Sequence, residues 1–79
     1  MKYYVGLDVS LNTVFVCIVD EKGKVLRENE IPSTPEAIGS FLKGTGLEIE
    51  KIGLESGNLT HYLKKGLKTM GYEVVLLLH

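Results

Sequence analysis

The sequence predicts an α/β domain built on one mixed five-stranded sheet. The first 31 residues read as three short apolar strands joined by tight turns, and the rest alternates helical and strand periodicities. The chain has 79 residues, of which 44% are hydrophobic and 24% charged. These values are typical of one small globular domain or of part of one.

The N-terminal segment predicts an antiparallel meander of three strands. The strands are expected at residues 3–8, from Thr13 to Asp20, and from Val25 to Ile31. Gly23 supplies the positive φ that the second hairpin turn requires. The middle strand is apolar on both faces, which is typical of a strand covered on both sides, whereas the third alternates and reads as an edge.

Two helices and two strands follow the meander. Ser33 and Glu36 have capping-box spacing, Pro35 suits a first helical turn, and Gly44 offers a C-terminal stop. The fourth strand is expected at residues 51–55.

The second helix is expected to start at Asn58 or a neighbour and to end at Gly71, and the fifth strand to cover residues 72–78. The apolar residues at helical spacing in that helix, predicted to be packed, are Leu59, Tyr62, Leu63, Leu67 and Met70.

Right-handed crossovers then predict the strand order 3-2-1-4-5, with strand 2 antiparallel to the others and both helices on one face of the sheet. This is a ribonuclease H-like (RuvC-like) architecture. The other face has no helix, although residues 74–78 are apolar at every position, as in a strand covered twice. We therefore expect a truncated domain whose uncovered face is completed by a later segment or by self-association.

Asp8 and Glu55 are lone acids at the ends of the first and fourth strands. If those strands are parallel neighbours, the two carboxylates lie together at one sheet edge, where they repel unless a cation separates them. Carboxylate oxygens are ligands that Mg²⁺ accepts, and divalent cations serve phosphate chemistry. The alternative for Asp8 is a turn cap, and for Glu55 a first-turn acid favoured by a helix dipole.

Composition and charge limit the partners and the cellular location that we expect. A net charge of -1 argues against a freestanding nucleic-acid binder, which usually carries a basic excess. The single cysteine, Cys17, fits a reducing, cytoplasmic location and is expected to be packed and inert. Neither a signal peptide nor an apolar stretch of about 20 residues, the length that spans a bilayer, is recognised. We therefore expect no membrane partner.

Two segments carry a family resemblance. Residues 4–10, Tyr-Val-Gly-Leu-Asp-Val-Ser, and residues 53–58, Gly-Leu-Glu-Ser-Gly-Asn, are similar to the corresponding motifs of the DEDD transposases of bacterial insertion sequences, relatives of Piv-type DNA invertases. The resemblance covers essentially the whole chain. One departure is Leu11, where the family often has a lysine.

The resemblance implies a transposase that recombines DNA with Mg²⁺ or Mn²⁺ held by four acids, of which Asp8 is the first and Glu55 the second. The remaining two acids and a serine-containing domain are expected beyond His79. Residues 1–79 would then be the N-terminal part of one nuclease domain, inactive alone, whose parent is an enzyme. The family also implies oligomeric assembly and a structured RNA partner.

Several other polar residues are weaker candidates for contacts with nucleic acid. Ser10 and Asn12 are turn formers that lie near enough to the predicted edge to touch a phosphate. Lys64, Lys65 and Lys68 form a basic stripe on the second predicted helix, which a solvated helix face explains equally well.

Other functions remain open at this stage. Actin-like proteins and sugar kinases start with a similar strand, Asp and hairpin, but their phosphate-binding turn needs glycine, and residues 9–12 contain none. A non-catalytic interaction module and a Holliday-junction resolvase with the same metal chemistry are the further alternatives.

Overall fold

The computed structural model describes residues 1–55 and 57–77. Its elements are, in order, β1 (Tyr3–Val9), β2 (Thr13–Val19), β3 (Val25–Pro32), α1 (Pro35–Thr45), β4 (Ile49–Glu55), α2 (Thr60–Thr69) and β5 (Val74–Leu77). Ser56, Leu78 and His79 lie outside the described residues.

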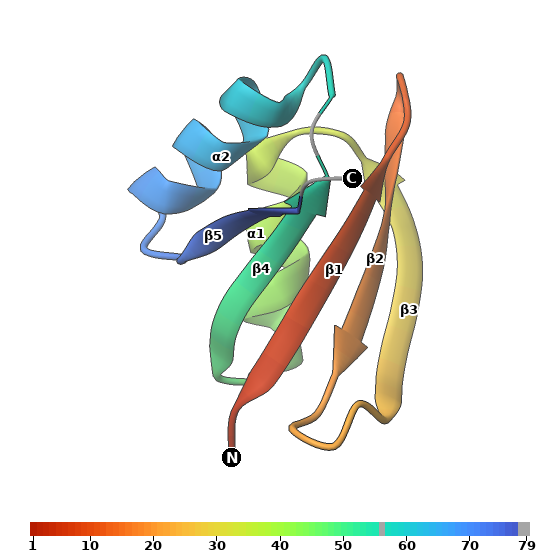
Figure 1. Ribbon diagram of the computed structural model, residues 1–79, viewed down its shortest axis with the longest axis vertical. Helices are drawn as coiled ribbons and strands as arrows, with labels where there is room; N and C mark the ends of the chain where they lie inside the picture. The colour runs from red at the N-terminus through yellow and green to blue at the C-terminus, as the bar shows by residue number, and fades with distance from the viewer. Residues whose placement is uncertain (56, 78–79) are drawn as a thin grey trace.

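The strands form one sheet in the order β3-β2-β1-β4-β5, as the sequence predicts (Figure 1). β2 is antiparallel to β1 and to β3, whereas β4 runs parallel to β1 and to β5. The helical crossover from β3 carries the chain across β2 and β1 to the far side of β1. The result is a mixed α/β sheet in which the N-terminal strand lies at the centre.

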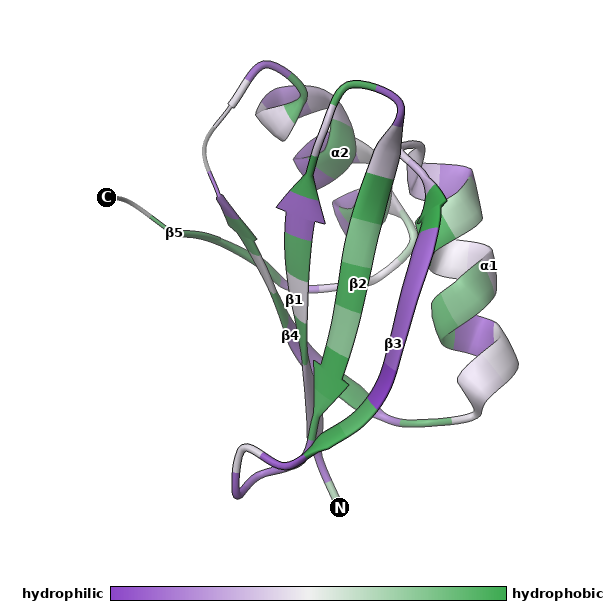
Figure 2. Ribbon diagram, turned by 90° about the vertical axis from the view of Figure 1, so that its right-hand side faces the viewer, coloured by the Kyte–Doolittle hydropathy of each residue, from purple (hydrophilic) through white to green (hydrophobic). Residues whose placement is uncertain are grey.

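Both helices lie on the same side of the sheet, which we call the covered face (Figures 1 and 2). Alternate strand residues point into this layer, because successive side chains of a strand point to opposite faces. In the middle of β1, β2 and β4 the exposed fractions of these residues are 3% or less, whereas Tyr3 and Val9 at the ends of β1 are partly buried. The buried core consists of Val5, Leu7, Val14, Val16, Ile18, Ile38, Leu42, Ile52, Leu54, Leu63, Leu67 and Val74.

No helix among the described residues covers the opposite side, which we call the open face (Figure 2). The alternate strand residues on this side include Tyr4, Gly6, Asp8, Thr13, Phe15, Cys17, Val19, Glu28, Glu30, Lys51, Gly53, Glu55, Val75 and Leu77. Phe15 is 43% exposed and Leu77 is 47% exposed. β2 is therefore apolar on both sides but covered on only one.

The start of α1 differs from the predicted capping box. Thr34, and not Ser33, is the N-cap, and its side chain accepts a hydrogen bond from the Ala37 N–H at 3.1 Å. The Ser33 hydroxyl instead donates to the Leu11 carbonyl at 3.4 Å. Ser33 is thus used to hold the β1–β2 loop against the β3–α1 connection, a contact between residues distant in sequence.

The C-terminal stop of α1 lies two residues after the predicted one. Gly46 adopts φ 69° and its N–H donates to the Lys43 carbonyl, whereas Gly44 is inside the helix. Positive φ at the residue after the last turn favours glycine. Gly44 and Gly46 offer the same C-terminal signal in the sequence, and the structure uses the second.

α2 begins without a side-chain cap, because Leu59 occupies the N-cap position predicted for Asn58 or a neighbour. It ends before Gly71, which has φ 97°, as the sequence predicts. α2 also lies very close to α1. A Cβ on Gly66 would overlap the ring of Pro35, and a Cβ on Gly39 would lie 2.5 Å from the Met70 sulfur.

Each of the five strands differs at one end from its predicted bounds. β1 extends to Val9, β2 ends at Val19, β3 extends to Pro32, β4 begins at Ile49, and the described part of β5 begins at Val74. The predicted edge role of β3 is confirmed, because β3 is the outermost strand beside β2, and every residue from Val25 to Glu30 is exposed.

Candidate functional site

Asp8 and Glu55 occupy equivalent positions on neighbouring parallel strands. Gly6 pairs with Gly53 and Leu7 with Leu54, so the next residue along each strand is one of the two acids. Both side chains fall on the open face, because Leu7 and Leu54 are buried on the other side. Parallel strands lie about 4.8 Å apart, so the two acids are close neighbours at the carboxyl edge of the sheet.

The surroundings of this acidic pair are partly apolar. Asp8 lies opposite Phe15 in β2, and Glu55 lies beside Leu77 in β5. Both acids are exposed to solvent. Among the described residues, no group of three or more His, Cys, Asp or Glu side chains is arranged to hold a metal ion.

The donor set at this edge fits a loosely held hard cation. Two carboxylates supply only oxygen ligands, and Mg²⁺ commonly takes one or two carboxylates with water or phosphate completing the shell. Asp8 is a short ligand on a central strand, whereas Glu55 ends its strand and has a longer reach. The pair therefore offers the beginning of a binding site and not a closed protein cage.

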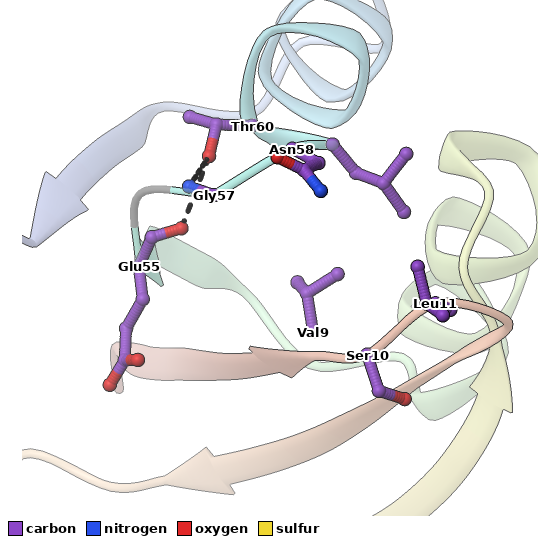
Figure 3. A pocket seen from close by; sticks show the side chains of 8 residues that line it. Val9, Ser10, Leu11, Glu55, Gly57, Asn58 and Thr60 are labelled. Carbon is purple, nitrogen blue, oxygen red and sulfur yellow. Dashed lines mark hydrogen bonds between the residues drawn. The ribbon is translucent and has the colours of Figure 1, made fainter.

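A cavity of about 250 Å³ lies beside this edge, between the β1–β2 loop and the segment that leads into α2. The lining is contributed by Val9, Ser10, Leu11, Glu55, Gly57, Asn58, Leu59 and Thr60 (Figure 3). Figure 3 shows the Glu55 side chain directed away from Asn58 and Leu11. Asp8 is not part of the lining, so the acidic pair and the cavity are adjacent features and not one site.

Ser10 and Asn12 serve the β1–β2 turn. The Ser10 hydroxyl donates to the Thr13 carbonyl at 2.9 Å and lies 3.1 Å from the Thr13 hydroxyl. The Ser10 N–H also donates to the Thr13 carbonyl, and the Asn12 carbonyl accepts from Ser33 N–H. The turn interpretation accounts for these contacts, and both side chains remain exposed near the edge.

Thr60 has a role that the sequence analysis missed. Its buried hydroxyl accepts from the Gly57 N–H at 2.5 Å and donates to the Glu55 carbonyl at 3.3 Å (Figure 3). This hydroxyl fixes the first turn of α2 to the end of β4 and thereby positions the Glu55 backbone. A threonine at a helix start was the available signal, but sequence alone does not reveal its distant carbonyl partner.

The lysines of α2 lie apart from the acidic pair, on a helix surface that faces solvent. Lys65 and Lys68 are exposed and Lys64 is half-buried. Tyr62 is 51% exposed, so its predicted place in the core is wrong. The helix buries the stripe containing Thr60, Leu63 and Leu67 instead. Tyr62 therefore belongs to the same solvent-facing surface as the lysines.

Comparisons with known proteins do not assign the chain to a family. The sequence matches no protein-family model and no curated protein. None of the described helices is both long and apolar enough to cross a membrane.

Proposed function

We propose that this chain is the N-terminal part of a ribonuclease H-like nuclease domain of the DEDD transposase type, acting on DNA phosphodiesters with Mg²⁺ or Mn²⁺. The observation that carries the proposal is the parallel register of β1 and β4, in which Asp8 and Glu55 follow the paired Leu7 and Leu54. The resemblance of the segments that contain these two acids supports the same assignment.

In this proposal the protein supplies rigid carboxylates at a sheet edge that nucleic acid can reach. Asp8 and Glu55 would hold a divalent cation, which supplies charge neutralisation at phosphate oxygens. The central position of β1, bonded to a strand on both sides, fixes Asp8, and the Thr60 hydroxyl fixes the end of β4. With two of the family's four acids, the chain is expected to bind a cation weakly and not to cleave DNA.

The lysines of α2 are proposed to contact the DNA backbone. No acidic residue lies between Glu55 and Glu73, so Lys64, Lys65 and Lys68 form an uninterrupted basic segment in a chain of net charge -1. Such a surface attracts phosphates in a salt-dependent way. A structured RNA partner, which the family resemblance implies, would use the same electrostatic attraction.

Mn²⁺ binding tests the proposal directly. Loss of the free-ion signal in electron paramagnetic resonance would measure binding to the wild-type chain, to Asp8→Ala and to Glu55→Ala. We expect each substitution to remove the binding, because one carboxylate with water holds the ion too weakly. Since the Asp8 side chain is exposed, the circular dichroism spectrum and unfolding midpoint of Asp8→Ala should remain close to wild type.

Glu48→Ala is the matched control, because Glu48 is an exposed acid outside the strands and its substitution removes the same charge. Mn²⁺ binding that persists in Asp8→Ala would contradict the metal role of the pair. Equal losses in Glu48→Ala would mean that net charge, and not the paired strand ends, attracts the ion.

A phosphotransferase of the actin-like or sugar-kinase type is supported less well. In such proteins the loop after the first strand must bring backbone N–H groups to phosphates. Here the Ser10 N–H is already bonded to the Thr13 carbonyl, and Leu11 is 81% exposed at the loop tip. Absence of ATP binding together with Asp8-dependent Mn²⁺ binding would separate the two functions.

A further inference from the structure

The open face contains an apolar hollow at the middle of the sheet. Gly6 and Gly53 are directly paired in β1 and β4, so no side chain rises from the two central positions. The resulting hollow, of about 430 Å³, is lined mainly by Tyr4, Cys17, Val75 and Leu77 together with Val19 and Lys51. We call it the glycine hollow. A Cβ on Gly6 would meet no atom within 4 Å, whereas a Cβ on Gly53 would lie 3.3 Å from Leu77 Cδ1, so the hollow is open above Gly6 and is bounded by Leu77 beside Gly53.

Carboxylates outnumber cations around the glycine hollow. Glu28 and Glu30 lie on the β3 side, and Asp8 and Glu55 lie at the carboxyl edge. Among the described strand residues of the open face, the cation is Lys51, and its ammonium lies 3.8 Å from the Glu73 carboxylate. The open face thus combines an apolar centre with an acidic border on two sides.

We propose that the open face docks a basic amphipathic helix of a partner protein, with one large apolar side chain seated in the glycine hollow and lysine or arginine side chains along the acidic border. A sheet face buries its apolar surface most readily under helices, as the covered face of this protein already does. Because the border is acidic, the residues that flank the apolar side of that helix are expected to be basic. This inference does not depend on the proposed nuclease function, because Glu28 and Glu30 of the border take no part in the proposed cation site. At Asp8 and Glu55 a bound cation and the basic flank of a helix would exclude one another.

A second copy of the same face complements this surface poorly. Face-to-face association would enclose the acids Asp8, Glu28, Glu30 and Glu55 of both copies in one interface, with one Lys51 from each copy to offset them. Like charges brought together on leaving water are costly. A helix with a basic flank meets the same border with opposite charge, and this favours it over self-association.

Two peptides and the native thiol test the proposal. Both peptides are helices of about 18 residues with leucine at positions i, i+3, i+4 and i+7, one with lysine flanks and the other with glutamate flanks. Cys17 is the single cysteine and lines the glycine hollow, so its rate of alkylation by iodoacetamide reports coverage. We expect the lysine-flanked peptide to slow alkylation, with less effect at high salt, and the glutamate-flanked peptide to leave the rate unchanged.

Gly6→Val fills the hollow in a strand position that tolerates a β-branched side chain, and it should weaken binding of the lysine-flanked peptide by about tenfold. Ser40→Val, at an exposed position of α1, is the control and should leave the affinity for this peptide unchanged. Glu28→Lys should also weaken this binding, whereas Glu48→Lys, with the same change in net charge, should not. Circular dichroism would verify that each variant is folded.

Three results would overturn the proposal. Equal binding of the two peptides would show that the border does not select charge. Undiminished peptide binding to folded Gly6→Val would show that the glycine hollow does not bind the apolar side chain of the helix. Sedimentation velocity that reveals a dimer, with Cys17 already protected in the absence of peptide, would identify a second copy as the occupant.

Discussion

The two faces of the sheet are made by the same strands but differ in almost every physical property. Val14, Val16 and Ile18 of β2 are completely buried on the covered face, whereas Phe15, between the first two of these, is 43% exposed on the open face. The covered face is apolar and filled by two helices. The open face contains paired glycines, half-exposed apolar side chains and acids.

This contrast separates stability from recognition. Burial of apolar surface provides most of the favourable free energy of folding, and here it is concentrated on the covered face. The open face contributes less to stability, which leaves its side chains available for the acidic pair and for a partner. Substitutions matched in residue type but placed on opposite faces provide the strongest tests of this division.

The largest effect is expected from Leu54→Ala compared with Leu77→Ala. Leu54 is fully buried on the covered face, and truncating such a side chain typically costs about 2–5 kcal/mol. Leu77 is 47% exposed on the open face, so the same truncation should cost about 1 kcal/mol or less. Urea unfolding followed by circular dichroism measures both. Similar losses in the two variants would mean that the open face is also part of the stabilising core.

A smaller effect is expected where the two covering helices touch. Gly66→Ala places a methyl group against the Pro35 ring, and overpacking of this kind costs about 1–3 kcal/mol. Gly44→Ala is the control, since its Cβ would meet no neighbour and alanine is favoured over glycine inside a helix by about 1 kcal/mol. We expect the unfolding midpoint to fall in the first variant and to rise in the second. A rise in both would contradict the close contact between α1 and α2.

Edge strand β3 contacts α1 on the covered face through a cation–π pair. The Arg27 guanidinium lies 5.4 Å from the centre of the Phe41 ring in α1. Exposed cation–π contacts contribute about 0.5–1 kcal/mol, so Arg27→Gln should reduce the free energy of unfolding by that amount. Glu28→Gln, the next residue on the opposite face, should leave it within error of wild type. Equal effects would assign the loss to strand propensity and not to the aromatic contact.

The smallest expected effect concerns the fall in the free energy of unfolding at high pH. Partial burial raises the pKa of the Tyr72 hydroxyl above its ordinary value of 10.0. The protonated Tyr72 hydroxyl therefore contributes to the free energy of unfolding. This contribution is complete below the unfolded-state pKa near 10.0 and is lost as pH rises through the higher folded-state pKa, because ionisation is easier in the unfolded chain. Tyr72→Phe should remain more stable relative to wild type as pH increases through this range. Parallel pH profiles of stability for the two proteins would contradict this assignment.

Much of the fold was predictable because it follows from local patterns. Apolar alternation identified the strands, Gly23 and Gly71 marked turns with positive φ, and right-handed crossovers fixed the strand order. The same reasoning placed Asp8 and Glu55 side by side, since it requires only that β1 and β4 be parallel neighbours. Whether these carboxylates bind a cation stays a prediction.

The features that sequence reasoning missed depend on contacts between distant residues. Ser33 and Thr34 are both good N-caps, and the bond from Ser33 to the Leu11 carbonyl decides between them. The helical spacing of Tyr62 suits a buried stripe, but α2 buries Leu63 and Leu67 and leaves Tyr62 51% exposed.

The sequence by itself thus determined which residues form strands and helices, and which acids share a sheet edge, because periodicity and chain direction are local properties. The tertiary structure alone decided where α1 begins and ends, that Tyr62 of α2 is exposed, and that Gly6 and Gly53 pair to open a hollow on the uncovered side. Those outcomes depend on how separate elements pack, and packing is set by shape and volume across the whole domain.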